Sequence, residues 1–355
     1  MNIYYLSPDQ NWPSGGVAKI YRHVDILNKY GYSAYVLHEK KGFRCTWFEN
    51  KTKVAYRVKP LWRKCKDKLF HAKVNPIKRK VCFPCNHSSQ YIRNVDYLVV
   101  PEIYGLQILN MEPGVKKIIF NQGPVFTFSG YSCDPLDLRS PYNDPHGDVV
   151  GVMTNSHYTE EYMSHAFPGL KLFPLYHCSR DIDVFLNDSR KKKQICFMSR
   201  KNYADALQVI NILKFRGFLK NYNVIAIDAK SLSETANIMK ESLIFLSFCH
   251  QEGSFLPPSE AMLCGCVVIG YHGWGGREYL KPDFSFPIES GDIIGFAKTV
   301  EKVIKELEVN PTAYSEKIKS AAAFIKEQYS PAKEEAELVQ IWDQIAGDFG
   351  RVCRR

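Results

Sequence analysis

Short apolar runs and amphipathic stretches alternate along the chain. An apolar run at residues 1–6 is followed by a glycine loop, after which Ile20, Val24 and Leu27 recur at the spacing of one helix face. Gly31 suits the end of that helix, and another apolar run follows it. The pattern predicts strand, helix and strand, which is the repeating unit of a parallel α/β sheet.

The same alternation continues and divides into two halves. Three further strands of the first half are predicted at residues 95–102, 116–123 and 149–156. A chain of 355 residues is long for one core and suits two. We therefore expect two Rossmann-like domains and a closing helix with a basic tail, at residues 1–178, 179–330 and 331–355.

Residues 251–280, with the apolar run before them, carry the most specific chemistry. The apolar run 243–248 predicts a buried strand, and Pro257-Pro258 suits the first turn of a helix that ends at Gly265. Free backbone N–H groups at such a helix start can bind a diphosphate. We expect Glu260, in the first helical turn, to bind the ribose of a nucleotide, and Glu252 to face the attached sugar. The alternative is that Glu260 complements the helix dipole and Glu252 is a solvated loop acid.

Two cations follow an earlier strand, predicted at residues 195–198. Arg200 and Lys201 stand at its end, before a helix with Ala206, Val209, Ile210 and Leu213 on one face. A guanidinium and an ammonium there can neutralise the charge that develops on a departing diphosphate. The alternative is a solvated Arg-Lys pair at a helix start.

Together these motifs resemble glycosyltransferase family 4. The pair Glu252 and Glu260 matches its E-x7-E signature, and Gly275, Gly276 and Glu278 match its GG-x-E ending. In that family a glycine, an arginine and a slightly later lysine stabilise the leaving group, whereas here Ser199 replaces the glycine and the lysine is adjacent to the arginine. The safer assignment is therefore Arg200.

The resemblance implies the GT-B fold: two Rossmann-like domains face a cleft, and a C-terminal helix crosses back to the first domain. It implies transfer of a hexose or pentose with retention, without a metal or other cofactor, from a UDP- or GDP-linked donor. Arg200, Lys201 and Glu252 would be catalytic. The donor would be bound by Gly15, Gly16, Gly253, Ser254, Phe255 and Glu260.

Two details of the resemblance differ in this chain. Members often place a histidine after a first-domain strand to contact the sugar, whereas this chain has Asn121 and Gln122 there, as candidate contacts to sugar or acceptor. A D-x-D at Asp181 and Asp183 follows the predicted crossover, where the family often has a structural aspartate. We assign it no metal.

Positive charge is concentrated in one stretch of the first domain. Residues 57–93 contain eleven Lys or Arg and one acid, which equals the whole formal net charge of +10. Such a segment is a candidate dock for an anionic acceptor, such as nucleic acid, acidic lipid or a lipid diphosphate, or it is a solvated loop without a partner. The residues we expect to dock an acceptor are Arg63, Lys64, Lys66, Lys78, Arg79 and Lys80.

The eleven cysteines lack the compact spacing of a secreted disulfide scaffold. Cys82, Cys85 and His87 have the spacing of half a zinc site, which Cys65 or His71 could complete, but we favour reduced thiols in a basic loop. No run of about 18 apolar residues is present to span a bilayer, and residues 1–6 are too short for a signal peptide. A cytoplasmic protein, peripheral to a membrane or DNA, is expected.

These observations predict a retaining glycosyltransferase that acts on a glycan or lipid-linked acceptor. The first alternative is transfer to hydroxymethylated DNA bases, with the basic segment binding the duplex. A nucleotide-sugar epimerase is less favoured because it needs acid-base carboxylates and histidines that we cannot place. An inactive nucleic-acid-binding relative is less favoured because Glu252, Glu260 and Arg200 are all present.

Overall fold

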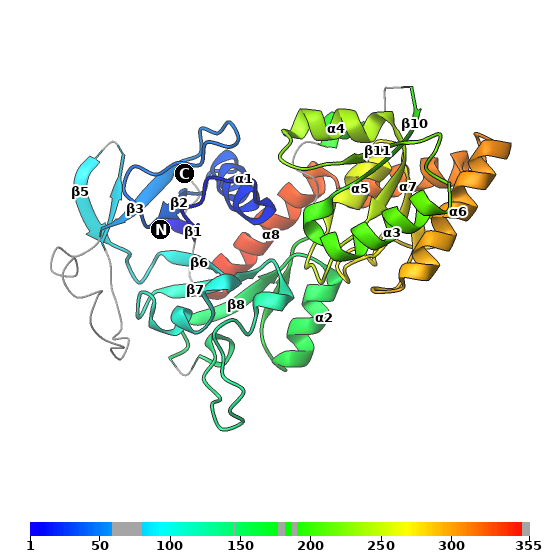
Figure 1. Ribbon diagram of the computed structural model, residues 1–355. Helices are drawn as coiled ribbons and strands as arrows, with labels where there is room; N and C mark the ends of the chain where they lie inside the picture. Colours follow the sequence, from blue (N-terminus) through cyan, green and yellow to red (C-terminus); the bar gives the residue numbers. More distant parts are fainter. Residues whose placement is uncertain (59–79, 85, 145, 177–181, 187–189, 350–355) are drawn as a thin grey trace. The chain divides into compact units, whose positions relative to one another are not determined.

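The computed structural model describes residues 1–58, 80–84, 86–144, 146–176, 182–186 and 190–349. It contains two compact α/β units (Figure 1). Unit 1 consists of residues 1–155, 159–175 and the C-terminal segment from residue 335, and unit 2 of residues 156–158 and 176–334. The α/β class that the alternating pattern predicts is confirmed.

Unit 1 is built on a nine-stranded sheet in the order β5-β4-β3-β2-β1-β6-β7-β8-β9. Its strands are β1 Ile3–Leu6, β2 Ala34–His38, β3 Val54–Val58, β4 Lys80–Phe83, β5 Asn86–Tyr91, β6 Tyr97–Pro101, β7 Lys116–Asn121, β8 Val149–Thr154 and β9 Leu172–Pro174. The pairs from β3 through β2, β1, β6, β7 and β8 to β9 are parallel. Every residue of β1 and β6 is buried, as expected for central strands covered on both faces.

Residues 80–91 differ from the loop that the basic composition suggests. Here β4 pairs antiparallel with β3 and with β5, so the sheet continues beyond its parallel part. Val81 and Cys82 are buried on β4, and this burial explains why a charged segment contains a strand. Residues 59–79 lie outside the described residues.

The helices and 3-10 helices are α1 Gly15–Lys29, η2 Glu102–Asn110, η3 Pro124–Phe126, η4 Pro141–Asn143, α2 His157–Ala166, η5 Ile182–Phe185, η6 Ser199–Lys201, α3 Tyr203–Phe215, α4 Leu232–Glu241, α5 Leu256–Leu263, α6 Ile293–Val309, α7 Ser315–Gln328 and α8 Pro331–Phe349. The predicted apolar face of α1 is confirmed, since Ile20, Val24 and Leu27 are all buried. Gly31 follows α1 with φ +85, a conformation that glycine adopts without strain. No helix among the described residues is long and apolar enough to cross a membrane.

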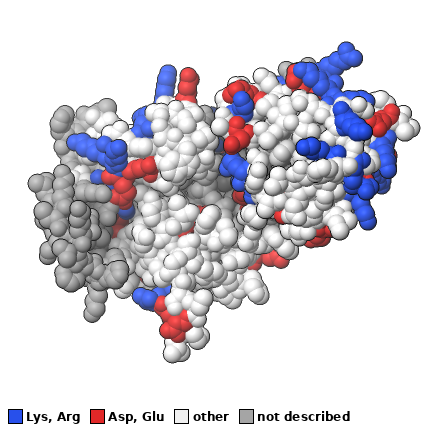
Figure 2. Space-filling view, viewed as in Figure 1, with Lys and Arg blue, Asp and Glu red and all other residues white. Residues whose placement is uncertain are grey.

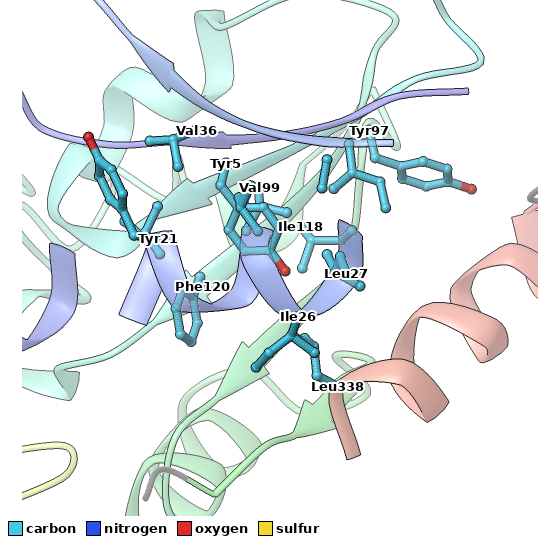
Figure 3. Packing of buried hydrophobic residues seen from close by; sticks show 14 of the residues in the cluster. Tyr5, Tyr21, Ile26, Leu27, Val36, Tyr97, Val99, Ile118, Phe120 and Leu338 are labelled. Atoms are coloured by element: carbon cyan, nitrogen blue, oxygen red, sulfur yellow. The ribbon is translucent and has the colours of Figure 1, made fainter. Parts of the chain in front are cut away.

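The C-terminal helix α8 completes the core of unit 1. Figure 3 shows this core, with Tyr5 and Val99 from the sheet, Ile26 from α1 and Leu338 from α8. Trp342 of α8 is fully buried, and its indole N–H donates to Tyr5 Oη over 3.1 Å. The predicted closing helix therefore packs on the first domain, as the resemblance implied.

Unit 2 has a five-stranded, fully parallel sheet in the order β11-β10-β12-β13-β14. Its strands are β10 Lys192–Phe197, β11 Asn223–Ala226, β12 Ser242–Ser247, β13 Val267–Gly270 and β14 Phe286–Pro287. One cluster packs α3 and α6 against the sheet, and another packs α4, α5 and α7 against it. Ala206, Val209 and Leu213 of α3 are buried as predicted, whereas Ile210 is partly buried.

The strand order reverses once in each unit. In unit 1, β1 lies between β2 and β6, and in unit 2, β10 lies between β11 and β12. Loops that leave the carboxyl ends of such neighbouring strands turn to opposite faces of the sheet and leave a crevice for ligands. Each unit therefore has one favoured ligand position, at the ends of β1 and β6 in unit 1 and of β10 and β12 in unit 2.

Candidate functional site

The crevice position of unit 2 brings together two predicted site residues. Lys201 ends η6, directly after β10, and Glu252 lies in the loop after β12. Lys201 Nζ lies 2.5 Å from Glu252 Oε1, and both side chains are partly exposed. The sequence motifs lie fifty residues apart, and the pairing of β10 with β12 makes them neighbours. Arg200 is exposed next to Lys201.

Helix α5 begins beside this ion pair. Phe255 is its N-cap and is buried, and prolines occupy the first turn as predicted. Because α5 begins at Leu256, Glu260 lies beyond the first turn, which corrects its predicted position by about one residue. Ser254 and Glu260 are partly buried, while Gly253 is buried. The predicted stop at Gly265 is confirmed by its φ of +76.

The loop of residues 272–276 supports the loop that carries Glu252. Glu252 N–H donates to Gly273 O over 2.8 Å, and Gly275 N–H donates to Glu252 O over 3.2 Å. A Cβ on Gly275 would collide with the carbonyl oxygen of Gly253, so the backbones approach at a distance that only glycine permits. The GG-x-E ending thus has a structural task, since Gly275 lets the two loops pack together.

An aromatic cluster occupies the tip of the same loop. The Trp274 ring stacks on Tyr158 with centroids 5.6 Å apart, and the Arg277 guanidinium lies 5.7 and 5.9 Å from the centroids of Tyr158 and Trp274. Trp274 N–H donates to His272 Nδ1 over 2.9 Å, which requires an unprotonated nitrogen. Burial lowers the pKa of His272 against the opposing charge of Glu289, and the charge of Arg277 lowers it further.

Glu278, the acid of the GG-x-E ending, has partners other than Lys201 and Glu252. Glu278 Oε1 accepts a hydrogen bond from His157 N–H, the first residue of α2, and Glu278 Oε2 accepts one from Tyr329 Oη, both over 2.6 Å. Its carboxylate binds the first N–H group of α2, and all three residues lie within unit 2. In the described residues, then, Glu278 binds backbone and tyrosine.

In unit 1 the predicted glycines begin α1, next to the strand-order reversal. A Cβ on Gly16 would lie 3.2 Å from Gln122 Nε2, whereas nothing lies within 4 Å of one on Gly15. Gln122 is half-buried beside this loop, and its carbonyl accepts a hydrogen bond from Asn155 Nδ2 over 2.7 Å. Asn121 is fully buried, and its Nδ2 donates to Thr127 Oγ1 over 2.8 Å. Gln122 therefore faces the glycine loop, and Asn121 faces the core.

A buried acid at the end of β6 was not predicted. Glu102 is 3% exposed, and the backbone N–H groups of Gln122 and Gly123 donate to its carboxylate. Its Oε2 has no hydrogen-bond partner among the described residues. Burial raises the pKa of Glu102 to about 7, against the opposing effect of these hydrogen bonds. Glu102 thus holds the backbone of Gln122 at the crevice position of unit 1.

Most of the predicted acceptor dock lies outside the described residues, namely Arg63, Lys64, Lys66, Lys78 and Arg79. Lys80 is described and exposed, with Nζ lying 5.4 Å from the centroid of the Tyr91 ring. On the face shown in Figure 2, Lys and Arg are mixed with Asp and Glu over most of the described surface and outnumber them at the right end. Asp183 lies in η5, and Asp181 falls outside the described residues.

Most candidate ligands of the zinc alternative lie outside the described residues. Of its candidate ligands, Cys82 is buried on β4, whereas Cys65, His71, Cys85 and the side chain of His87 lie outside what is described. The described part of the chain contains no cluster of His, Cys, Asp and Glu that could bind a metal ion.

Sequence motifs alone do not indicate the roles of Glu102, Tyr158, His272 and Trp274. Glu102 directly follows β6, and His272 and Trp274 lie in the loop after β13, so their position after a strand is the signal that could have found them. Tyr158 is the second residue of α2 and carries no such signal. Trp274 also has glycines on both sides, which marks a loop with unusual backbone angles.

The sequence is similar to that of a glucosyltransferase. No protein-family model matches the chain. An alpha-1,6-glucosyltransferase of Actinobacillus pleuropneumoniae serotype 7 (strain AP76) is 26% identical over 270 residues, which cover 70% of this chain and 75% of the relative.

Solved structures with similar folds are GT-B proteins. A mutant of S. aureus TarM, solved with Fondaparinux, alpha-GlcNAc-glycerol and UDP, has a TM-score of 0.63 at 8% identity, and the match covers 97% of this chain and 99% of TarM. Sucrose-phosphate synthase from Thermosynechococcus elongatus has a TM-score of 0.62 at 10% identity, with 98% and 99% covered. Anabaena HepE, solved with UDP and glucose, has a TM-score of 0.57 at 13% identity, with the same coverage. The chain has the GT-B fold.

Proposed function

We propose that this GT-B protein is a retaining glycosyltransferase, which moves a hexose or pentose from a nucleotide sugar to a hydroxyl of a glycan or lipid-linked acceptor. Transferase activity is supported by the similarity to a glucosyltransferase and by the fold. The observation that carries the proposal is the meeting of Lys201 and Glu252 at the crevice position of unit 2, beside the start of α5. A cation, a carboxylate and free helix N–H groups are what a nucleotide sugar needs at its diphosphate and its hydroxyls.

Each group has a part in the proposed reaction. Arg200, Lys201 and the helix start near Ser259 stabilise the departing diphosphate. Glu260 binds the ribose hydroxyls. Glu252, with Gly253 and Ser254, positions the sugar. Because these cations belong to the chain itself, we expect transfer to continue in the presence of a chelator.

The bond changes follow from retention without a covalent intermediate. The acceptor oxygen bonds to the anomeric carbon on the face that the diphosphate leaves, and the anomeric carbon–oxygen bond breaks with its electron pair passing to the diphosphate. The hydroxyl proton passes to a diphosphate oxygen. UDP is the favoured nucleotide, since the similar structures of TarM and HepE contain UDP.

A panel of UDP- and GDP-sugars tests the proposal. The wild type should release the nucleotide diphosphate and, with an acceptor, form a product whose anomeric configuration matches the donor by NMR. Glu260→Ala should bind the donor more weakly, and Arg200→Ala should mainly lower kcat. The proposal would be contradicted if the wild type bound none of the nucleotide sugars and released no nucleotide diphosphate. The mechanism would be contradicted if peptide mapping found a sugar bonded to a side chain.

A second acceptor is favoured by the charge of residues 57–93. Their net charge of +10 could follow the phosphates of DNA that contains hydroxymethylated pyrimidines. Mass spectrometry of nucleosides after incubation with such DNA separates the two acceptors. A hexose or pentose added to the base by the wild type and not by Glu260→Ala would favour DNA, and slow nucleotide release without base modification would favour a glycan or lipid.

A further inference from the structure

We propose that Trp274 forms one wall of a pyranose-binding site at the carboxyl edge of the unit 2 sheet. Its indole would stack on a sugar ring, either the one that leaves the donor or the one that receives it. The inference rests on the proposed function, because it assigns the sugar part of that same site to a residue outside the motifs.

The backbone of Trp274 is the first observation. Its φ is +67, in the left-handed region, directly after Gly273 with φ +58. Bulky side chains rarely adopt this conformation, and strained backbone tends to cluster where a ligand is bound. Glycine would occupy the position without strain, yet tryptophan stands there with glycines before and after it. A task for the indole explains this choice.

The position of Trp274 is the second observation. Trp274 forms a parallel β-bridge with Glu252, the carboxylate that we expect to position the sugar. The same loop receives the Glu252 N–H at Gly273 O over 2.8 Å. Trp274 is therefore fixed beside Glu252 by backbone pairing, within reach of a ligand bound there.

The side chain is held in place and remains accessible. Tyr158 stacks on it at 26° between ring planes, His272 meets it edge-on at 5.5 Å between centroids, and Arg277 lies over both stacked rings. Trp274 nevertheless stays 44% exposed. A core tryptophan such as Trp342 is fully buried, so packing alone does not explain Trp274.

The chemistry of a pyranose suits this surface. Its axial C–H groups form an apolar face with slight positive charge, which an aromatic ring attracts through the negative face of its quadrupole. Its hydroxyls can meanwhile bond to a carboxylate such as Glu252. A rigid ring beside a carboxylate, with few rotatable bonds to order, fits a sugar better than a flexible apolar chain.

Calorimetric titration of the full-length protein tests the proposal with three variants. Trp274→Gly removes the ring and relieves the left-handed strain, so the fold should survive. Trp274→Phe keeps a smaller ring. Phe215→Ala, which removes an exposed aromatic side chain from α3 of the same unit, is the matched control. The ligands are UDP, the nucleotide sugar selected by the panel described above, and free glucose added to UDP-saturated protein.

We expect the UDP affinity of Trp274→Gly to lie within about twofold of the wild-type value. We expect Trp274→Gly to bind one of the two sugar ligands about tenfold more weakly than the wild type, and the affinity of Trp274→Phe for that ligand to lie between the two. Weaker binding of the nucleotide sugar assigns the platform to the donor, and weaker binding of glucose alone assigns it to the acceptor. Unchanged binding of both sugars, or an equal loss for UDP, would overturn the platform.

A fluorescence readout separates a platform from a structural role. Trp274 is the sole tryptophan in residues 176–334, so quenching by the sugar ligand that disappears in Trp274→Phe reports contact with the indole. Absence of that difference would count against the proposal. If the wild type binds no nucleotide sugar at all, the proposed function fails. If the wild type binds the nucleotide sugar and Trp274→Gly binds the sugar ligands equally well, only the proposed role of Trp274 fails.

Discussion

Lys201 and Glu252, two residues of the candidate site, form an ion pair that costs little to break. Their side chains are 23% and 28% exposed, so solvent weakens their attraction. Ion pairs at such partly exposed positions contribute about 1 kcal/mol or less. Breaking the pair therefore costs little, and an incoming diphosphate can take Lys201 while hydroxyl groups take Glu252.

Replacing Lys201 by glutamine should lower kcat about 100-fold to 1,000-fold, because it removes one cation that we propose stabilises the leaving group. Steady-state kinetics at saturating donor measures this change. Lys230→Gln is the matched control, since Lys230 also pairs with a glutamate, Glu234, on the exposed surface of unit 2. A kcat lowered equally in both variants would contradict a specific part for Lys201.

Glu102 should make the stability of unit 1 depend on pH. Its pKa is raised to about 7 in the folded protein. The contribution of Glu102 to the free energy of unfolding is therefore complete below pH 4.5, the ordinary pKa of the group, and is lost as the pH rises toward 7. Above pH 7 the free energy of unfolding is lower by about 3 kcal/mol than below pH 4.5. The neighbouring Tyr142, whose pKa is also raised by burial, stays neutral over this range.

Denaturant unfolding between pH 4 and 8 measures this effect. Glu102→Gln, which has no charge to bury, should lose less stability than the wild type over that range. Glu316→Gln provides the control, because the side chain of Glu316 is 86% exposed. Parallel curves for wild type and Glu102→Gln would show that Glu102 ionises freely in the folded protein.

At the scale of elements, the loop of residues 272–276 depends on glycine more than on its side chains. Gly275→Ala would place a Cβ against the carbonyl of Gly253, and one of the two loops must move. We expect a loss of about 1–3 kcal/mol of stability and a weaker hold on donor, measured by thermal unfolding and by donor Kd. Stability and donor affinity should fall together because Glu252 lies on one of these two loops.

The control for Gly275→Ala is Gly347→Ala. Gly347 lies in α8, and no atom lies within 4 Å of a Cβ there, so alanine should raise stability by up to about 1 kcal/mol. Donor affinity should not change in this variant. If Gly275→Ala behaved in the same way, the close approach of the two loops would not matter for the site.

At the scale of the whole molecule, the end of the chain stabilises unit 1. Trp342→Ala removes the largest fully buried side chain of the core that α8 shares with the sheet. We expect unit 1 to lose about 3–5 kcal/mol, while unit 2 unfolds as before. Scanning calorimetry should show one transition at lower temperature and one unchanged. Equal shifts of both would mean that the units do not unfold separately.

The sequence by itself determined the class of fold and the apolar faces of α1 and α3. Apolar runs and helical apolar patterns are local, so several strands, the buried face of α1 and the ends of α1 and α5 at Gly31 and Gly265 could be predicted. The closing helix α8 was also predicted. Local patterns could not reveal β4 and β5, because the surrounding charge resembles a loop and their antiparallel pairing joins separate segments.

Only the tertiary structure decided which residues meet. Lys201 and Glu252 are neighbours because β10 pairs with β12, and strand order is a property of the whole sheet. The left-handed backbone of Trp274, its stack on Tyr158 and the burial of Glu102 depend on side chains distant in sequence. Sequence periodicity thus specifies the elements, while long-range packing decides the partners, charges and shape of a site.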